Sequence, residues 1–297
     1  MRSLLFFLFL VPLLTVQGGK LSSEENKALQ SLCSPRLGRE ILNANPVPAS
    51  DVIGQSAVAI VVEGANRGVC SGTLISSRHV LTASHCFEQT ECTSSKPEMR
   101  VHVGATCIDD EACKGTVVGI RNYTAFPGYF PTECGSGRGS IPLDITVVEL
   151  EHDVHSGLAT IACLPDSADP PKELTGYGFG KDRFVIGKLG MLKWLTIDCP
   201  TVEKNKAMKE DSRVFCAKAK QFEQNGCFGD SGHGAVESGT RNKPIIHGVF
   251  SNGASCEDLA NMVLLKSRGK KIKFNGDPER FVSVFHYNLF ICEVSGI

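Results

Sequence analysis

The sequence lacks an excess of charge of either sign. Its 297 residues include 31 Lys and Arg and 32 Asp and Glu, which gives a formal net charge of −1. A protein that coats nucleic acid needs a strongly basic surface, so this balance argues against nucleic-acid binding as the main function. The length is sufficient for two ordinary hydrophobic cores and does not require oligomerisation for stability. We therefore expect a monomer with two domains.

The sequence also lacks an apolar run long enough to cross a membrane, which takes about 20 residues in a helix. The N-terminal run Leu4–Leu14 is shorter and follows the basic Arg2. It is followed by Val16 and Gly18, small residues that fit a signal-peptidase site. Residues 1–18 are therefore predicted to be a secretory signal peptide, and the mature protein should be extracellular and free of the membrane.

Cysteine, in contrast, is abundant, and all 13 cysteines lie after the predicted signal peptide. This number fits an oxidising compartment and a framework of disulfides, and because it is odd, at least one cysteine is free or pairs with another chain. The sequence Asn122-Tyr123-Thr124 is the one glycosylation sequon. In a secreted chain it predicts a glycan on Asn122 in an exposed loop.

Residues 19–40 have the character of a leader peptide that contains a short helix. Ser22 and Glu25 have the spacing of a capping box. An apolar side of the helix would be formed by Leu21, Leu29 and Leu32. The segment is too short to fold alone.

From Ile41 onward the pattern changes to short apolar runs that are separated by Gly, Pro, Asn and Ser, without an internal repeat. Such runs predict an all-β sandwich or barrel. A stretch rich in Pro and Gly, residues 166–180, divides this region into predicted domains 41–165 and 166–297. A helix is predicted in the last segment, where residues recur near helical spacing: Phe281, Val284, Phe285, Leu289 and Cys292.

Three stretches hold residues suited to acyl-transfer chemistry. The small and polar GCFGDSGHG, residues 226–234, contains Ser231; residues 70–87 contain His85; and Asp144 precedes the apolar run ITVVEL. A hydroxyl nucleophile, a base that titrates near neutral pH and a carboxylate that orients the base are the groups this chemistry requires. The backbone N–H groups of Gly229 and Ser231 would stabilise the oxyanion.

The order of these residues separates two classes of hydrolase. The α/β-hydrolases run Ser, acid, His and carry a G-x-S-x-G elbow. This chain runs His, Asp, Ser, and the residue two positions after Ser231 is His233. The two-barrel serine-protease arrangement is the remaining match.

The same blocks resemble those of trypsin- and chymotrypsin-like serine proteases, from about Ile41 to the C-terminus. TLISSRHVLTASHC resembles the histidine block of that family, LDITVVEL the aspartate block and CFGDSGHG the serine block. TIACLPDSA, VFCA and GVFSNGASC resemble further landmarks in the same order. The ending FICEVSGI and the cysteine-rich insertions resemble a divergent, nematode-type branch of secreted trypsin-like proteins.

The resemblance implies two six-stranded antiparallel β-barrels, a C-terminal helix, and a serine endopeptidase that acts on protein or peptide substrates without a cofactor or metal. The implied catalytic residues are His85, Asp144 and Ser231. The implied disulfides are Cys70–Cys86, Cys199–Cys216, Cys227–Cys256 and, from the leader, Cys33–Cys163. The family pattern gives no pairing for Cys92, Cys107, Cys113, Cys134 and Cys292.

The resemblance further implies synthesis as a zymogen. In the family, a new N-terminus folds inward and its ammonium pairs with the acid before the nucleophile, here Asp230. Ile41 is the candidate for that terminus, but Glu40 precedes it and the basic Arg39 is one position earlier. Three alternatives follow: an unusual cleavage, trimming of Glu40, or no activation.

The residues implied to line the primary substrate pocket are Asn225, Gly226 and Gly253. Asn225 stands where trypsins have the aspartate that selects Arg or Lys, so a medium or large uncharged side chain is the expected preference. The alternative function is a protease-like binding protein with little or no catalysis, because His233 and Gly234 replace the usual Gly-Pro.

Overall fold

A computed structural model of the chain describes the following residues: 19–33, 55–63, 68–88, 98–129, 141–155, 157–180, 186–199, 211–220, 225–238, 243–271 and 277–297. The predicted signal peptide, the end of the leader and Ile41 lie outside these residues. Within the described part of the chain, no helix has the length and apolar character that crossing a membrane requires.

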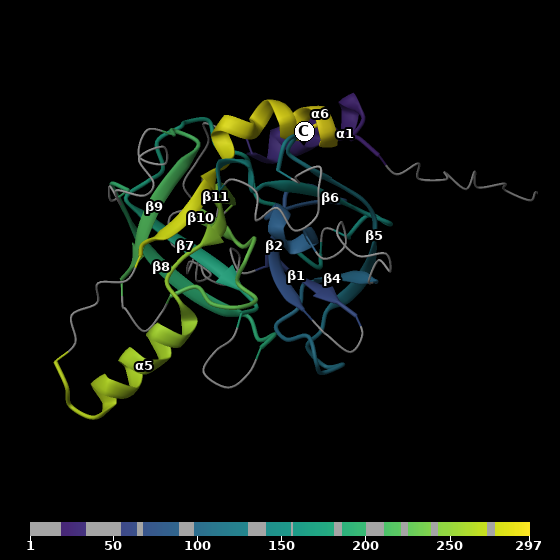
Figure 1. Cartoon of the computed structure of the whole chain (residues 1–297). Coiled ribbons are helices and arrows are strands. Elements are labelled where there is room, and N and C mark those ends of the chain that lie inside the picture. Colours follow the sequence, from purple (N-terminus) through teal and green to yellow (C-terminus); the bar gives the residue numbers. More distant parts are fainter. Residues whose placement is uncertain are drawn as a thin grey trace, which may run out of the picture.

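Two closed antiparallel barrels of six strands each form the body of the molecule (Figure 1). The first has the strand order β1-β2-β3-β6-β5-β4 and the second β10-β11-β12-β9-β8-β7. The strands of the first are β1 Ala57–Val62, β2 Val69–Leu74, β3 His79–Thr82, β4 Met99–Val103, β5 Thr116–Ala125 and β6 Thr146–Leu150. Those of the second are β7 Glu173–Gly178, β8 Gly190–Ile197, β9 Val214–Ala219, β10 Gly234–Ser238, β11 Pro244–Asn252 and β12 Glu279–Ser283. The predicted fold of two six-stranded barrels is confirmed.

Strand β1 shows why its apolar run AVAIVV has no polar alternation. Successive side chains of a strand point to opposite faces. Val58 and Ile60 pack in the core inside the first barrel, together with residues such as Val101. The intervening Ala59 and Val61 belong to a second core, which also contains side chains of the second barrel. Both faces of the strand are therefore buried, one inside its own barrel and one between the barrels.

The C-terminal helix, α6, covers Asn288–Ser295 and is preceded by a 3₁₀ turn, Val284–Tyr287. The predicted helix is therefore confirmed at its end, but its expected start is wrong. Phe281 lies in β12 and pairs with Phe215 of β9, because closure of the barrel requires this strand.

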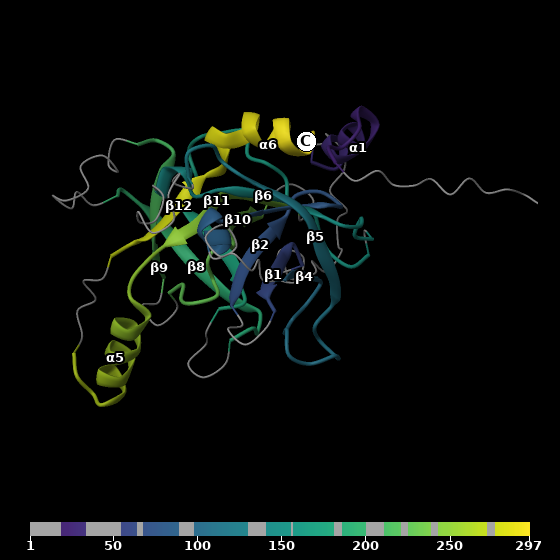
Figure 2. The same cartoon turned by 45° about the vertical axis from the view of Figure 1, so that its right-hand side comes forward.

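The leader helix, α1, covers Ser23–Cys33 and lies beside α6 in both views (Figures 1 and 2). The predicted capping box is present: the Ser22 N–H donates to Glu25 Oε2 over 2.7 Å, and the Glu25 N–H donates to Ser22 Oγ over 3.2 Å. Leu29 is buried as expected, whereas Leu32 is 49% exposed.

A third helix, α5 (Cys256–Ser267), was not expected from the sequence. It begins at Ser255, whose hydroxyl accepts the Asp258 N–H, and it projects away from the second barrel (Figure 1). Leu259 is buried, whereas Leu264 is 48% exposed. The helix therefore has little core contact, which explains why its apolar periodicity is weak.

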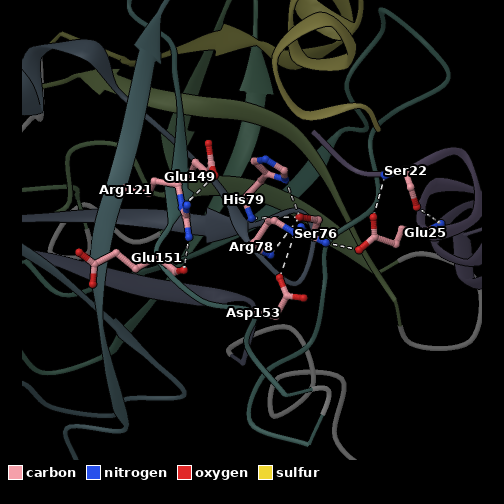
Figure 3. Close-up of polar contacts among 9 residues, drawn as sticks. All are labelled: Ser22, Glu25, Ser76, Arg78, His79, Arg121, Glu149, Glu151 and Asp153. Atoms are coloured by element: carbon pink, nitrogen blue, oxygen red, sulfur yellow. Dashed lines mark hydrogen bonds and ion pairs between the residues drawn. The ribbon is translucent and has the colours of Figure 1, made fainter. Parts of the chain in front are cut away.

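Arg78 joins the leader to the first barrel. Its guanidinium forms an ion pair with Glu25 of α1 and another with Asp153, 2.9 Å away (Figure 3). The arginine side chain is 4% exposed, whereas the two carboxylates are 43% and 38% exposed. A buried guanidinium requires such partners, since an unpaired charge in this position is costly. The Cys33–Cys163 disulfide fixes the end of the same helix.

We expect the substitution Arg78→Met to lower the free energy of unfolding by about 1–3 kcal/mol, because α1 loses its ionic contact with the barrel. Urea unfolding of the purified full chain measures this difference. Arg100→Met is the matched control, because Arg100 forms an exposed ion pair with Glu98. The control should change stability by less than about 0.5 kcal/mol. Equal effects of the two substitutions would contradict this role of Arg78.

Candidate active site

Asp144 and His85 form the most constrained polar contact at the junction of the barrels. Asp144 Oδ2 is 2.8 Å from His85 Nδ1, and Asp144 Oδ1 accepts the backbone N–H of His85 over 2.9 Å. The carboxylate is buried, with 2% of the residue exposed. Because one carboxylate contacts both the ring and the backbone of the same histidine, it fixes the orientation of the ring. A carboxylate at Nδ1 also favours a proton there and leaves Nε2 as the basic nitrogen.

The local structure explains this placement. His85 lies in a 3₁₀ turn, Ser84–Phe87, that follows β3, and the neighbouring Cys86 is joined to Cys70 of β2. Asp144 lies two residues before β6, which pairs with β3. Adjacent strands of the first barrel thus bring the two residues together.

Ser251, on β11 of the second barrel, donates a hydrogen bond to Asp144 Oδ2 over 2.6 Å. This residue was not identified from the sequence, although it lies in the landmark GVFSNGASC, from which only Gly253 and Cys256 were taken. The Asp144 carboxylate therefore holds groups from both barrels.

Ser231 lies in a turn that depends on glycine. Gly229 has a φ of +96° and Gly232 a φ of +83°, which side chains other than glycine rarely adopt. A Cβ atom at Gly229 would lie 2.9 Å from the Cα atom of Gly180. The two glycines are therefore needed to bring the serine to this position.

Two contacts place this turn against the first barrel. The Ser231 carbonyl oxygen accepts the N–H of Ser71 over 2.7 Å and lies 3.9 Å from Sγ of Cys86, the residue after His85. The structure thus brings the predicted serine close to the histidine segment. Among the described residues the Ser231 hydroxyl has no hydrogen-bond partner; in free enzymes such catalytic hydrogen bonds are often long and shorten when substrate binds.

The backbone N–H groups of this turn fall into two sets. The N–H groups of Cys227, Phe228, Asp230, Gly232 and His233 all donate to acceptors of the chain. Within the described residues, the N–H groups of Gly229 and Ser231 donate to none. Since unpaired N–H groups are uncommon next to a buried segment, these two are available to an anionic oxygen.

Asp230 is buried beneath the turn, with 8% of the residue exposed. Its two oxygens accept the N–H groups of Gly180 and Cys227, each over 2.9 Å. Burial raises the pKa of this carboxyl to about 6, although both hydrogen bonds oppose the shift. In the described part of the chain no cation pairs with Asp230, and its expected partner, Ile41, lies outside that part.

The predicted pocket residues Gly226 and Gly253 both lie against a side chain that sequence reasoning missed, Glu279. The Gly226 N–H donates to Glu279 Oε1 over 2.9 Å, and a Cβ atom at Gly253 would lie only 1.9 Å from Glu279 Oε2. The half-buried Asn225 begins the same segment. Glu279 is 1% exposed, and burial is the main reason that its pKa is raised to about 8; the nearby Asp230 adds to the shift.

His233, one of the departures from the family pattern, is completely buried in the second barrel. Its ring stacks between Trp194 and Phe250, with centroid distances of 5.0 and 4.8 Å. Burial lowers its pKa to about 4, so the imidazole is neutral at physiological pH. The residue therefore fills the core of the second barrel.

The remaining expected features are found as follows. All four disulfides implied by the resemblance are present, and Cys107–Cys113 is a fifth. Cys292 is a free, exposed thiol, while Cys92 and Cys134 lie outside the described residues.

Asn122, the residue of the glycosylation sequon, is exposed as expected, but it lies in strand β5 and not in a loop. Within the described ranges, no group of three or more His, Cys, Asp or Glu residues is arranged to hold a metal ion.

Comparison with known proteins agrees with the fold. "Trypsin-like protease try-5" from Caenorhabditis elegans is 27% identical over 237 residues, which cover 64% of this chain and 70% of that protein. A solved structure titled "HL collagenase" superposes with a TM-score of 0.56 at 19% identity. The superposition covers 82% of this chain and 94% of the collagenase, and it supports the fold. The sequence model of the trypsin family matches residues 50–265, and the chain therefore belongs to the trypsin family.

Proposed function

We propose that this protein is a secreted serine endopeptidase with His85 as the base, Asp144 as the orienting acid and Ser231 as the nucleophile. The observation that carries the proposal is the double contact of Asp144 with His85, through Nδ1 and the backbone N–H. A histidine needed only for packing has no use for a carboxylate that fixes its tautomer through Nδ1 and its orientation through the backbone N–H. The family and the five disulfides support an extracellular location.

The proposed reaction proceeds through an acyl-enzyme. Ser231 Oγ attacks the carbonyl carbon of the scissile peptide bond, and its proton moves to His85 Nε2. The same proton passes to the leaving nitrogen when the carbon–nitrogen bond breaks. Water then attacks the acyl carbon and gives its proton to His85; the bond to Ser231 Oγ breaks, His85 returns the proton to that oxygen, and the carboxylic acid product leaves. Asp144 stabilises the imidazolium in both steps.

The unpaired N–H groups of Gly229 and Ser231 supply the oxyanion hole in this proposal. Both belong to the turn that positions the nucleophile, so the donors and the hydroxyl are fixed together. Loss of one such donor typically lowers kcat by about 10²- to 10³-fold.

We expect a fluorophosphonate probe to label the secreted protein at Ser231, because the reagent requires an activated serine. Labelling is measured before and after limited proteolysis, and the modified peptide is identified by mass spectrometry. Ser231→Ala should abolish labelling, whereas Ser212→Ala, at an exposed serine, should leave it unchanged. Absence of labelling under every activation condition would instead favour the protease-like binding protein.

We expect Asp144→Asn to lower kcat by about 10⁴-fold at neutral pH, because the amide no longer holds His85 in the required tautomer. Hydrolysis of a peptide substrate measures this effect, and fluorophosphonate labelling of the same sample should slow in parallel. Asp169→Asn, at an exposed aspartate, is the matched control. An unchanged kcat for Asp144→Asn would remove the carboxylate from the mechanism.

We also propose that the protein is made as a zymogen in which a new N-terminus at Ile41 pairs with Asp230. The buried Asp230 carboxylate supports this proposal, because it has two N–H donors but no cation among the described residues. An ammonium at this position would favour the charged carboxylate and stabilise the turn of Ser231.

N-terminal sequencing of active protein should therefore find a chain that starts at Ile41, in addition to the leader. The leader is expected to remain attached through Cys33–Cys163. Asp230→Asn should prevent activation without preventing the cleavage itself, because the ion pair is lost. Active material with an uncut leader would contradict the zymogen proposal and leave the catalytic proposal intact.

A further inference from the structure

Glu279 is the buried acid that the proposed mechanism does not use. It is the first residue of β12, and its side chain reaches between the segment that leads to Ser231 and the segment that follows β11. Oε1 accepts the Gly226 N–H, while Oε2 has no hydrogen-bond partner among the described residues. A buried carboxylate with an unpaired oxygen is rare in folded proteins, because it loses its hydration without compensation.

The charged groups around Glu279 do not supply a partner. The nearest one that acts on it is Asp230, which carries the same sign and disfavours the ionised carboxylate. The adjacent Arg280 is directed elsewhere: its guanidinium donates to Asn252 over 3.3 Å and lies 3.9 Å from Asp277. Within the described part of the chain, the cation that Glu279 requires is therefore absent.

Gly226 and Gly253, which both lie against the Glu279 side chain or next to it, show that this carboxylate is close to the catalytic residues. Gly226 lies five positions before Ser231, and Gly253 lies two positions after Ser251, the partner of Asp144. The Glu279 carboxylate thus lies between the two segments that flank the catalytic residues. A Cβ atom at Gly253 would lie 1.9 Å from Glu279 Oε2 and one at Gly226 would lie 2.7 Å from the Phe250 ring, so glycine at both positions lets the carboxylate and the ring approach the backbone.

We propose that Glu279 forms the base of the primary substrate pocket and binds the cationic side chain of a lysine or arginine on the acyl side of the scissile bond. This inference rests on the proposed protease function. It replaces the preference for an uncharged side chain that was expected from Asn225, because the negative charge comes from Glu279 of β12 and not from position 225.

Selectivity follows from the cost of leaving the carboxylate unpaired. A lysine or arginine side chain gives the buried Glu279 a charge-assisted hydrogen bond. An apolar side chain of similar size would cover the same carboxylate and deprive it of any remaining solvent. The Phe250 ring, whose tip would lie 2.7 Å from a Cβ atom at Gly226, provides an apolar wall for the aliphatic part of the side chain.

The test uses p-aminobenzamidine, a cation whose fluorescence reports binding, on the full chain in the activation state that reacts with fluorophosphonate. The Ser231→Ala background removes catalysis, so binding alone is measured. We expect Glu279→Gln to weaken binding by about 30-fold or more, because a buried charge pair loses one partner. The amide oxygen introduced by this substitution can still accept the Gly226 N–H, which keeps the local backbone in place. Glu237→Gln is the matched control, since Glu237 pairs with His247 outside this site.

The pH dependence gives a second readout that a structural role would not produce. With a pKa raised to about 8, Glu279 is largely neutral below pH 8 and charged above it. Binding of p-aminobenzamidine should therefore strengthen as the pH rises from 6 to 9, and this rise should be absent in Glu279→Gln. Asp230, the charged group that acts on Glu279, has its pKa raised to about 6 and titrates at the start of this range, but it is present in both proteins, so only the rise that Glu279→Gln removes is assigned to Glu279.

A stability measurement separates loss of binding from loss of fold. The pKa of Glu279 in the folded protein is above that of the unfolded chain, so its contribution to stability is present below about pH 4.5 and lost as the pH rises through about 8. Glu279→Gln should therefore melt at the same or a higher temperature than the wild type at pH 9.

The outcomes distinguish the two proposals. If the protein reacts with fluorophosphonate but Glu279→Gln binds p-aminobenzamidine as tightly as the Glu237→Gln control does, the pocket assignment is overturned while the protease remains. Cleavage of a peptide library mainly after neutral residues would likewise overturn the pocket assignment and leave the protease proposal intact. Cleavage after lysine or arginine that is lost in Glu279→Gln supports the assignment. Failure to react with fluorophosphonate is a failure of the proposed function.

Discussion

The structure depends on the contact between the two barrels that Ser71 makes. This residue of β2 is fully buried. Its N–H donates to the Ser231 carbonyl over 2.7 Å, and its hydroxyl donates to the Gly229 carbonyl over 2.8 Å and accepts the Phe179 N–H over 2.9 Å. Ser71 thus holds the serine turn of the second barrel through its backbone N–H and its hydroxyl donor, and its hydroxyl oxygen also accepts from Phe179, the residue after β7. Because the histidine and the serine come from different barrels, their separation is set by this contact.

Three buried carboxylates near the site differ in how completely they are hydrogen-bonded. Asp144 receives the His85 N–H, the His85 ring and the Ser251 hydroxyl; Asp230 receives two backbone N–H groups; and Glu279 receives one. The fully bonded acid can orient a base without help from outside the chain. The other two carry an energetic cost in this state, and such a cost is typical of groups that await a charged partner.

Much of the fold and of the site could be predicted because it is encoded locally. Short apolar runs indicate barrel strands, and Ser22 with Glu25 indicates the start of α1. The positions of Phe281 and Glu279 could not be predicted in this way, since they depend on pairing between strands that are far apart in sequence. Arg280 pairs with Asn252 across the whole of α5 and the residues after it. Periodicity within a short window contains no information about that register. For this reason Glu279, whose carboxylate lies against Gly253, could not be identified from the sequence.

The docking of α1 has a consequence for how the protein can be produced. A recombinant chain that begins at Ile41 would lack Cys33, so Cys163 would become an additional thiol beside the already free Cys292. It would also remove Leu21 and Leu29 from the hydrophobic core to which Phe290 and Ile291 of α6 belong. Such a truncated chain invites wrong disulfide pairing and aggregation, and the leader is better regarded as the first element of the folded domain than as a disposable extension.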